Sequence, residues 1–155
     1  MNYLLLKSLH VFSVVLFLGN IIIGVFWKLH ADLRGDLRGK ALTLEGIIRA
    51  DRWFTLPGVV LIIVTGVRMA TLAHLPIART GWLLWALILF GASGIAFQFF
   101  VAPLQRRLLA NVNAGLAGTW DQPAYDRLSR AWGIWGTVAT LAPMGSLFLM
   151  VTKPF

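Results

Sequence analysis

The chain has 155 residues, of which 58% are hydrophobic and 13% are charged, and its formal net charge is +8. The apolar share exceeds the roughly 45–50% of an ordinary soluble domain, which excludes a disordered chain and indicates a membrane protein. The absence of cysteine excludes a disulfide scaffold, thiolate catalysis, iron–sulfur clusters and cysteine-containing zinc sites.

Four stretches of the chain are long and apolar enough to cross a membrane. A helix rises about 1.5 Å per residue, so about 20 mainly apolar residues cross a hydrocarbon core of about 30 Å. A tryptophan marks one end of each stretch, as expected for rings at the headgroup level. The sequence therefore predicts an all-α bundle of four transmembrane helices in one integral membrane domain, residues 1–155, with spans at about 4–27, 53–72, 82–104 and 132–152.

The distribution of Lys and Arg predicts the orientation of the bundle. Six of these residues lie between the first two spans and four between the last two, whereas the opposite side carries only Lys7, Arg68, Arg79 and Lys153. The positive-inside rule places the two long connections in the cytoplasm and both termini on the outer side. Because topology accounts for most of the basic residues, no nucleic-acid partner is expected.

The two long connections are expected to be partly helical. Apolar and charged residues alternate at helical spacing over 41–52, so the second helix should begin well before it enters lipid. Asp121 and Pro123 suit the N-cap and first turn of a helix that leads into the fourth span. The repeated Asp-Leu-Arg-Gly of residues 32–39 is expected to form a solvated turn. Three prolines are expected to bend their helices: Pro57, Pro103 and Pro143.

One ionisable side chain well inside a span is the first candidate for chemistry. His10 lies six residues beyond Leu4, about 9 Å of helix rise from the outer side. Such a group is expected to face the bundle interior or a water-filled cavity. One interpretation makes His10 a metal ligand, and the other makes it a neutral imidazole hydrogen-bonded to a neighbouring helix. Lys7, one turn earlier, is expected to extend its ammonium group to the interface.

Further ligands are expected in the outer half of the bundle. Arg68 and Met69 end the second span, and Met144 lies in the outer half of the fourth. Met and His are usual axial ligands of haem and suit Cu(I), and an arginine could pair with a haem propionate. The predicted cofactor is haem b, bound by His10, Arg68, Met69 and Met144, with His10 as the metal ligand. Simple packing is the alternative, since methionine often fills gaps between helices.

Other chemistries have little support. The motifs G-x-S-x-G, H-E-x-x-H and G-x-x-x-x-G-K-[ST] are absent from the sequence, and no catalytic residue is predicted. All six acidic residues fall in the two long connections. A carboxylate-based pathway for protons or cations within the spans is therefore not expected.

Four segments carry a family resemblance that covers nearly the whole chain. They are residues 6–11 (LKSLHV), residues 49–57 (RADRWFTLP), residues 81–83 (GWL) and residues 147–154 (LFLMVTKP). These segments resemble a family of short bacterial four-helix proteins described as predicted integral membrane proteins of unknown function. The resemblance implies a multi-pass protein of the bacterial inner (plasma) membrane.

A more distant resemblance rests on the spacing Lys7-x-x-His10. It is similar to the start of the first helix in the HemJ-type protoporphyrinogen oxidases and the CopD-like copper-resistance membrane domains. In the HemJ type, the resemblance implies that the histidine binds haem together with a lysine that follows a tryptophan at the start of a later helix. Here Trp82 is followed by residues 83–86, which contain no lysine. Only the position of His10 carries over.

Two functions remain open on the sequence. The first is a redox or ligand-binding protein that holds haem b in the outer half, with His10 as axial ligand and Arg68 beside a propionate. The second is non-enzymatic: a copper or small-molecule conduit, or an accessory subunit of a larger complex. A chain of this size is expected to act as a homo-oligomer or within a larger membrane complex. The lipid bilayer is a partner in every case.

Overall fold

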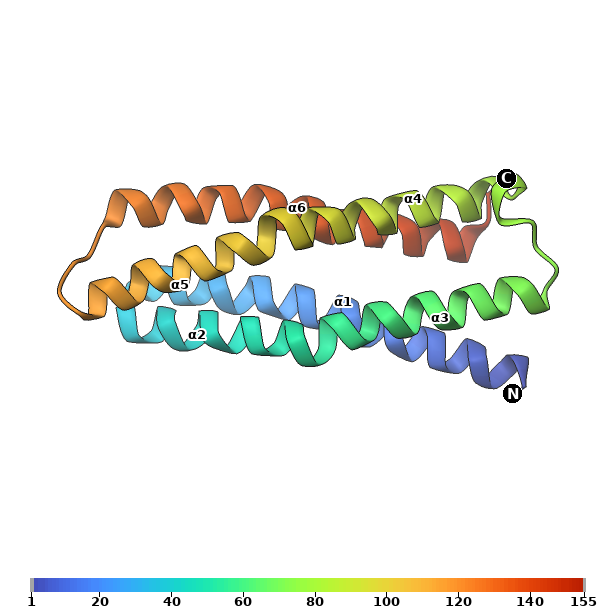
Figure 1. The fold of residues 1–155 in the computed structure, drawn as a ribbon, viewed down its shortest axis with the longest axis horizontal. Coiled ribbons are helices and arrows are strands. Elements are labelled where there is room, and N and C mark those ends of the chain that lie inside the picture. Colours follow the sequence, from blue (N-terminus) through green and yellow to red (C-terminus); the bar gives the residue numbers. More distant parts are fainter. Residues whose placement is uncertain (1, 155) are drawn as a thin grey trace.

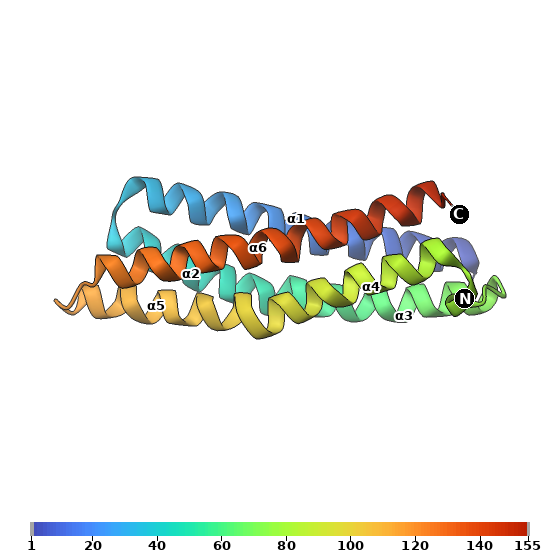
Figure 2. The ribbon, with the colours of Figure 1, turned by 90° about the horizontal axis from the view of Figure 1, so that it is seen from above.

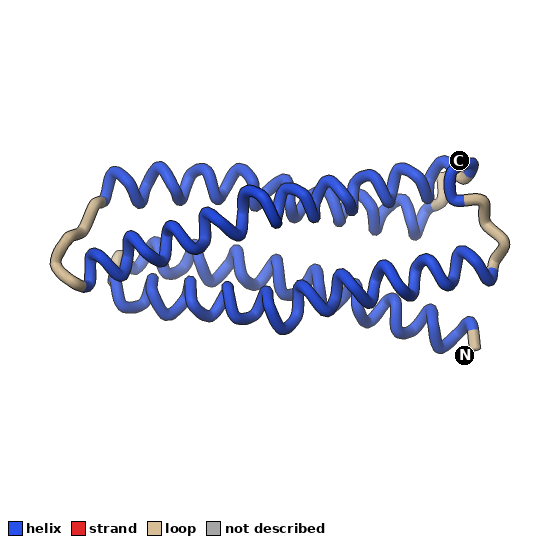
Figure 3. Tube along the Cα trace, viewed as in Figure 1, coloured by secondary structure: helices blue, strands red, loops and turns tan. Residues whose placement is uncertain are grey.

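The computed structural model describes residues 2–154, and this part of the chain consists of helices and short connections, without a β-strand. Four helices are long and apolar enough to cross a membrane, which confirms the predicted all-α class (Figure 3). The elements are α1 (Tyr3–Arg34), α2 (Leu37–Ala50), the π-helical η1 (Asp51–Thr55), α3 (Leu56–Leu72), the 3-10 turn η2 (Ile77–Arg79), α4 (Gly81–Ala96), the π-helical η3 (Phe97–Val101), α5 (Ala102–Leu116) and α6 (Gln122–Thr152). Because α2, η1 and α3 run without a break, they form one long helix, and α4, η3 and α5 form another.

The helices form an elongated antiparallel bundle (Figures 1 and 2). Both termini lie at one end with the α3–α4 connection, and we call this the terminal end. The opposite end, called the basic end, comprises residues 28–52 and 105–132 and holds ten of the Lys and Arg residues and all six acidic residues. The predicted placement of both termini at one end is therefore seen in the structure. That this end faces outward remains a prediction.

Each long helix extends beyond what a bilayer needs. The four helices have 31 to 36 residues, a rise of about 47–54 Å, whereas about 20 residues cross the hydrocarbon core. The excess lies at the basic end, because the charged residues there exclude it from lipid. In this water-exposed extension, α2 packs on α5 and α5 on α6 around a core that includes Leu44, Leu108, Val112 and Tyr125.

Toward the terminal end, the bundle is built from two helix pairs. There α1 packs on α3 and α4 packs on α6. The Ser93 hydroxyl donates to the Ala139 carbonyl at 2.7 Å, which joins the second pair. Phe17 of α1 and Phe90 of α4 lie 5.7 Å apart between ring centroids and connect the two pairs.

Two of the three prolines follow π-helical segments. Pro57 lies two residues after the end of η1, and Pro103 lies two residues after the end of η3. Proline lacks an N–H group and crowds the preceding turn, and a widened π turn accommodates both effects. Pro143 instead lies inside α6, which continues as α-helix through it.

The predicted solvated turn over residues 32–39 is mostly wrong. Only Gly35 and Asp36 separate α1 from α2. Gly35 ends α1 in a left-handed conformation with φ of 73°, and the Asp36 carboxylate accepts hydrogen bonds from the backbone N–H groups of Arg38 and Gly39. These two caps satisfy the helix ends, so the flanking residues stay helical.

The predicted start of the fourth helix is confirmed. The Asp121 carboxylate accepts a hydrogen bond from the Ala124 backbone N–H at 2.9 Å, and Pro123 lies in the first turn of α6. The proline has no N–H to leave unsatisfied at that position. The helix therefore begins ten residues before Trp132, in the water-exposed extension.

Candidate functional site

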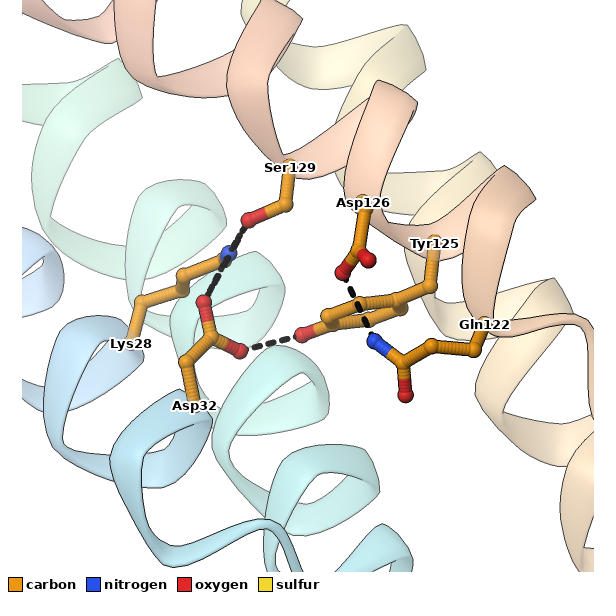
Figure 4. Close-up of polar contacts among 6 residues, drawn as sticks. All are labelled: Lys28, Asp32, Gln122, Tyr125, Asp126 and Ser129. Carbon is orange, nitrogen blue, oxygen red and sulfur yellow. Dashed lines mark hydrogen bonds and ion pairs between the residues drawn. The ribbon is translucent and has the colours of Figure 1, made fainter.

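A network of polar side chains joins α1 to α6 at the basic end (Figure 4). Lys28 and Asp32 lie one turn apart on α1, with the Lys28 Nζ atom 2.5 Å from an Asp32 carboxylate oxygen. The ammonium group also donates to the hydroxyl of Ser129, and the hydroxyl of Tyr125 donates to the other Asp32 oxygen. We call Lys28, Asp32, Tyr125 and Ser129 the Lys28 cluster.

The Lys28 cluster is unusually buried for a set of charged groups. Lys28 is 3% exposed, and its Nζ atom lies 5.3 Å from the ring centre of Trp132 and 5.4 Å from that of Tyr125. These faces attract the cation, which offsets part of its lost hydration. Burial lowers the pKa of Lys28, while the hydrogen bond and charge of Asp32 oppose that shift. Burial and Asp32 together raise the pKa of Tyr125. Both groups lie outside the predicted spans.

A cleft of about 380 Å³ runs between α1 and α6 from the Lys28 cluster toward the terminal end. Its polar end is lined by residues of the cluster, and its other end is lined by Ile22 and Leu141. Those two side chains are 49% and 58% exposed, so the cleft opens to the bundle surface. Gly133 and Gly136 of α6 also line it, and a Cβ atom added to either would meet nothing within 4 Å. The cleft thus has one polar end, one apolar end and free space along α6.

A second polar cluster surrounds Asp51, the first residue of η1. This residue is 8% exposed. One oxygen accepts hydrogen bonds from the Asn20 amide at 3.1 Å and the Thr55 hydroxyl at 2.9 Å, and the other accepts from the Gln105 amide at 3.0 Å. Burial raises the pKa of Asp51, which precedes the predicted span, and the three hydrogen bonds oppose that shift. Asp51, Asn20, Thr55 and Gln105 are called the Asp51 cluster.

A small cavity of about 30 Å³ lies between the Asp51 cluster and Trp132. Val25, Trp132, Gly136 and Thr140 line both this cavity and the α1/α6 cleft, so the two spaces adjoin. Trp132 is only 7% exposed, and its indole N–H has no acceptor within residues 2–154. An unsatisfied buried donor costs about 1–3 kcal/mol. The indole N–H therefore marks a position that suits an acceptor atom from outside the chain.

His10, the sequence-predicted ligand, is hydrogen-bonded to the neighbouring helix α3. Its Nδ1 atom lies 2.8 Å from the hydroxyl oxygen of Thr65, which in turn lies 2.5 Å from the Leu61 carbonyl oxygen. Because the hydroxyl donates to that carbonyl, the Nδ1–H of His10 donates to Thr65. The Nε2 atom then keeps its lone pair. Gly66 makes room for the ring, since a Cβ atom there would lie 3.2 Å from His10 Cε1.

The other predicted ligands are not joined to His10 by hydrogen bonds in the described chain. Met69 lies one turn beyond Thr65 on α3 and is partly buried, whereas Arg68 and Lys7 are exposed. Met144 is 44% exposed on α6. Residues 2–154 contain no group of three or more His, Cys, Asp or Glu side chains that could hold a metal ion. The ligand set therefore stays a prediction that rests on His10.

Sequence reasoning missed both polar clusters. The position of Lys28 indicates only the topology, although an Asp four residues later on the same helix is a recognisable ion-pair spacing. The position of Trp132 at the start of the fourth span predicts a ring at the headgroup level, whereas the structure buries the residue between helices. No local pattern could pair Asp51 with Gln105, which is 54 residues away.

The architecture defines an all-helical integral membrane protein with four helices long enough to span the bilayer. Residues 4–154 match the family described as predicted integral membrane protein (DUF2269), and the chain belongs to that family. No curated protein and no solved structure matches the chain. The resemblance to a family of predicted integral membrane proteins is therefore confirmed.

Proposed function

We propose that the protein binds a membrane amphiphile in the α1/α6 cleft. This is a non-enzymatic function, the second of the two that the sequence leaves open. The observation that carries this proposal is the graded lining of the cleft, with the buried ammonium of Lys28, the carboxylate of Asp32 and the hydroxyl of Ser129 at one end and aliphatic side chains at the other. Binding pockets are mostly apolar, with a few polar groups that fix the orientation of the ligand. The head of the amphiphile would lie at the Lys28 cluster, and its chain would extend along Ile22 and Leu141.

The free donors at the polar end favour a head group with acceptor oxygens. A lysine ammonium has three N–H donors, and two of those of Lys28 are directed to Asp32 and Ser129. The third donor is available to a phosphate or carbonyl oxygen. The surplus of basic residues at this end also favours anionic lipids. A phospholipid and a quinone share this acceptor chemistry, and they are distinguished by the test.

Filling the cleft is expected to remove the bound amphiphile. In Gly133→Leu the new Cβ atom meets no neighbour, and the rest of the side chain occupies the cleft. We expect the amount of amphiphile per protein to fall about tenfold, equivalent to about 1.4 kcal/mol of binding free energy. Mass spectrometry of organic extracts from detergent-purified protein measures this amount and identifies a phospholipid or a quinone.

The matched control is Gly91→Leu on α4, where an added Cβ atom also meets nothing within 4 Å but no part of the cleft is near the exposed residue. It should retain the amphiphile. Circular dichroism checks that both variants are folded. Equal amounts of amphiphile in both variants, or a wild-type protein with only the lipid composition of bulk detergent extracts, would contradict the proposal.

Haem b binding through His10 is a second candidate, supported by the hydrogen bond to Thr65. Histidines that ligate metals usually donate their other N–H group to a neighbouring acceptor, which fixes the ring and the tautomer. His10 has this arrangement, and the residues fit a first axial ligand at Nε2. Met69 or Met144 would supply the second ligand, and Arg68 would lie near a propionate. A bound haem would supply one-electron redox chemistry.

A spectrum tests the haem candidate. If haem is bound, His10→Ala should abolish the Soret band of detergent-purified protein, because the axial ligand is lost. His30→Ala, a histidine on the same helix that stacks on Phe26, serves as control and should leave the band unchanged. Oxidised and dithionite-reduced spectra with metal analysis record both results. A full Soret band in His10→Ala, or a colourless wild-type protein after expression with added haem, would exclude this candidate.

A further inference from the structure

We infer that Asp51 and a water molecule in the adjoining small cavity form a proton-exchanging site inside the bundle, which communicates with the α1/α6 cleft past Trp132. This inference does not depend on which molecule occupies the cleft. It assigns a role to the Asp51 cluster and to the unsatisfied indole N–H of Trp132.

The size and lining of the small cavity suit one water molecule. A water needs about 10–15 Å³ and two to four polar partners, and the cavity measures about 30 Å³. Trp132 contributes an N–H donor that has no acceptor within the described residues. Asp51, Asn20 and Gln105 line the opposite side and carry oxygen acceptors. A water placed here has the indole N–H as a candidate donor and the oxygens of Asp51, Asn20 and Gln105 as candidate acceptors.

The surroundings of Asp51 favour a carboxyl group that takes up and releases a proton. Its three hydrogen-bond partners are uncharged and come from α1, η1 and α5. The one ion pair within residues 2–154 joins Lys28 to Asp32, so no cation within ion-pair distance holds Asp51 in its charged form. Burial of the carboxyl group raises its pKa and so favours the protonated form.

The contact between the two spaces gives the proton a route to the surface. Gly136 is part of the wall that they share with Val25, Trp132 and Thr140, and it contributes no side chain there. On the far side, the cleft leads to Lys28, Asp32 and Ser129 and to the bundle surface. The sequence placed all carboxylates outside the spans and predicted no such route within them. Asp51 lies only two residues before the second span, and the fold turns it inward.

Infrared spectroscopy of the detergent-solubilised full chain tests this site. At mildly acidic pH we expect a C=O stretching band of one protonated carboxyl group that is absent in Asp51→Asn and shifts when H₂O is replaced by D₂O. Labelling the aspartate side-chain carboxyl with ¹³C assigns the band in the unsubstituted protein, so the test does not depend on Asp51→Asn folding. Failure to find such a band would overturn the inference.

The route past Trp132 is tested by a larger side chain at Gly136, which lines both the small cavity and the α1/α6 cleft. Gly136→Val adds methyl groups where a Cβ atom meets nothing within 4 Å, and we expect the H/D exchange of the Asp51 band to slow about tenfold or more because the water loses its place. Gly91→Val on the exposed face of α4 is the matched control and should exchange at the wild-type rate. Exchange in Gly136→Val as fast as in the control would overturn the inference. Because no ligand is added or extracted, a failure here leaves the amphiphile proposal unaffected.

Discussion

Lys28→Met is expected to lower the free energy of unfolding by about 2–3 kcal/mol. Removing one partner of a buried ion pair costs about 3–5 kcal/mol, because the other charge stays buried without its counterion. The Asp32 side chain is 23% exposed and keeps the Tyr125 hydroxyl as a donor, so the expected cost lies at or below the lower limit of that range. Thermal and denaturant unfolding, followed by tryptophan fluorescence in detergent, measure the change.

Two variants separate the loss of the ion pair from other effects of the substitution. In Lys28→Met/Asp32→Leu both charges are removed, and much of the lost stability should return because no unpaired charge remains. Lys7→Met replaces an exposed lysine of the same helix and should change stability by less than about 0.5 kcal/mol. A Lys28→Met protein as stable as Lys7→Met would show that the Lys28 cluster does not hold α1 to α6.

Leu108→Ala is expected to lower the free energy of unfolding by about 3 kcal/mol, within the range of about 2–5 kcal/mol for large-to-small substitutions in a core. Leu108 is 0% exposed and packs in the core of the basic end with Val112 and Tyr125. We expect this part of the bundle to lie in water, so the variant should lose both hydrophobic transfer free energy and packing. The same unfolding measurements record the change.

Ile62→Ala provides the comparison inside the lipid. Ile62 is 8% exposed in the contact between α1 and α3, but lipid chains are as apolar as the side chain that is removed. Only packing is lost, and we expect a cost of about 1 kcal/mol. Leu42→Ala, at a residue that is 65% exposed, is the control for the water-exposed end. Equal costs for Leu108→Ala and Ile62→Ala would contradict the division of the bundle into a water-exposed and a lipid-embedded half.

The class of protein and its four helices follow from the amino-acid sequence alone. In lipid every backbone polar group must be hydrogen-bonded within its own helix. A single long apolar stretch therefore crosses the membrane as an α-helix. Each predicted span lies within one of the four long helices. The positions of the charged residues in the sequence likewise distinguish the basic end from the terminal end, because charged side chains are excluded from the hydrocarbon core.

The sequence also indicated His10, because an ionisable residue within a span is rare enough to be noticed alone. Its partner Thr65 lies 55 residues away, and nothing local distinguishes Thr65 from the other threonines. The tautomer of His10 follows only from the hydrogen bond that Thr65 makes to its own helix. The choice between a packed and a ligating histidine therefore depends on the fold.

The positions of the polar clusters, by contrast, depend on how the helices pack in three dimensions. Lys28 meets Ser129 across 101 residues of sequence, and Asp51 meets Gln105 across 54. Such contacts depend on how each helix is rotated about its axis and how far it is shifted along its neighbour. Hydropathy carries little information on either quantity within a membrane, because a lipid-facing side chain and a buried one are equally apolar. Packing and the pairing of a few polar groups fix rotation and shift, and they bring Lys28, Asp51 and Trp132 to one set of cavities.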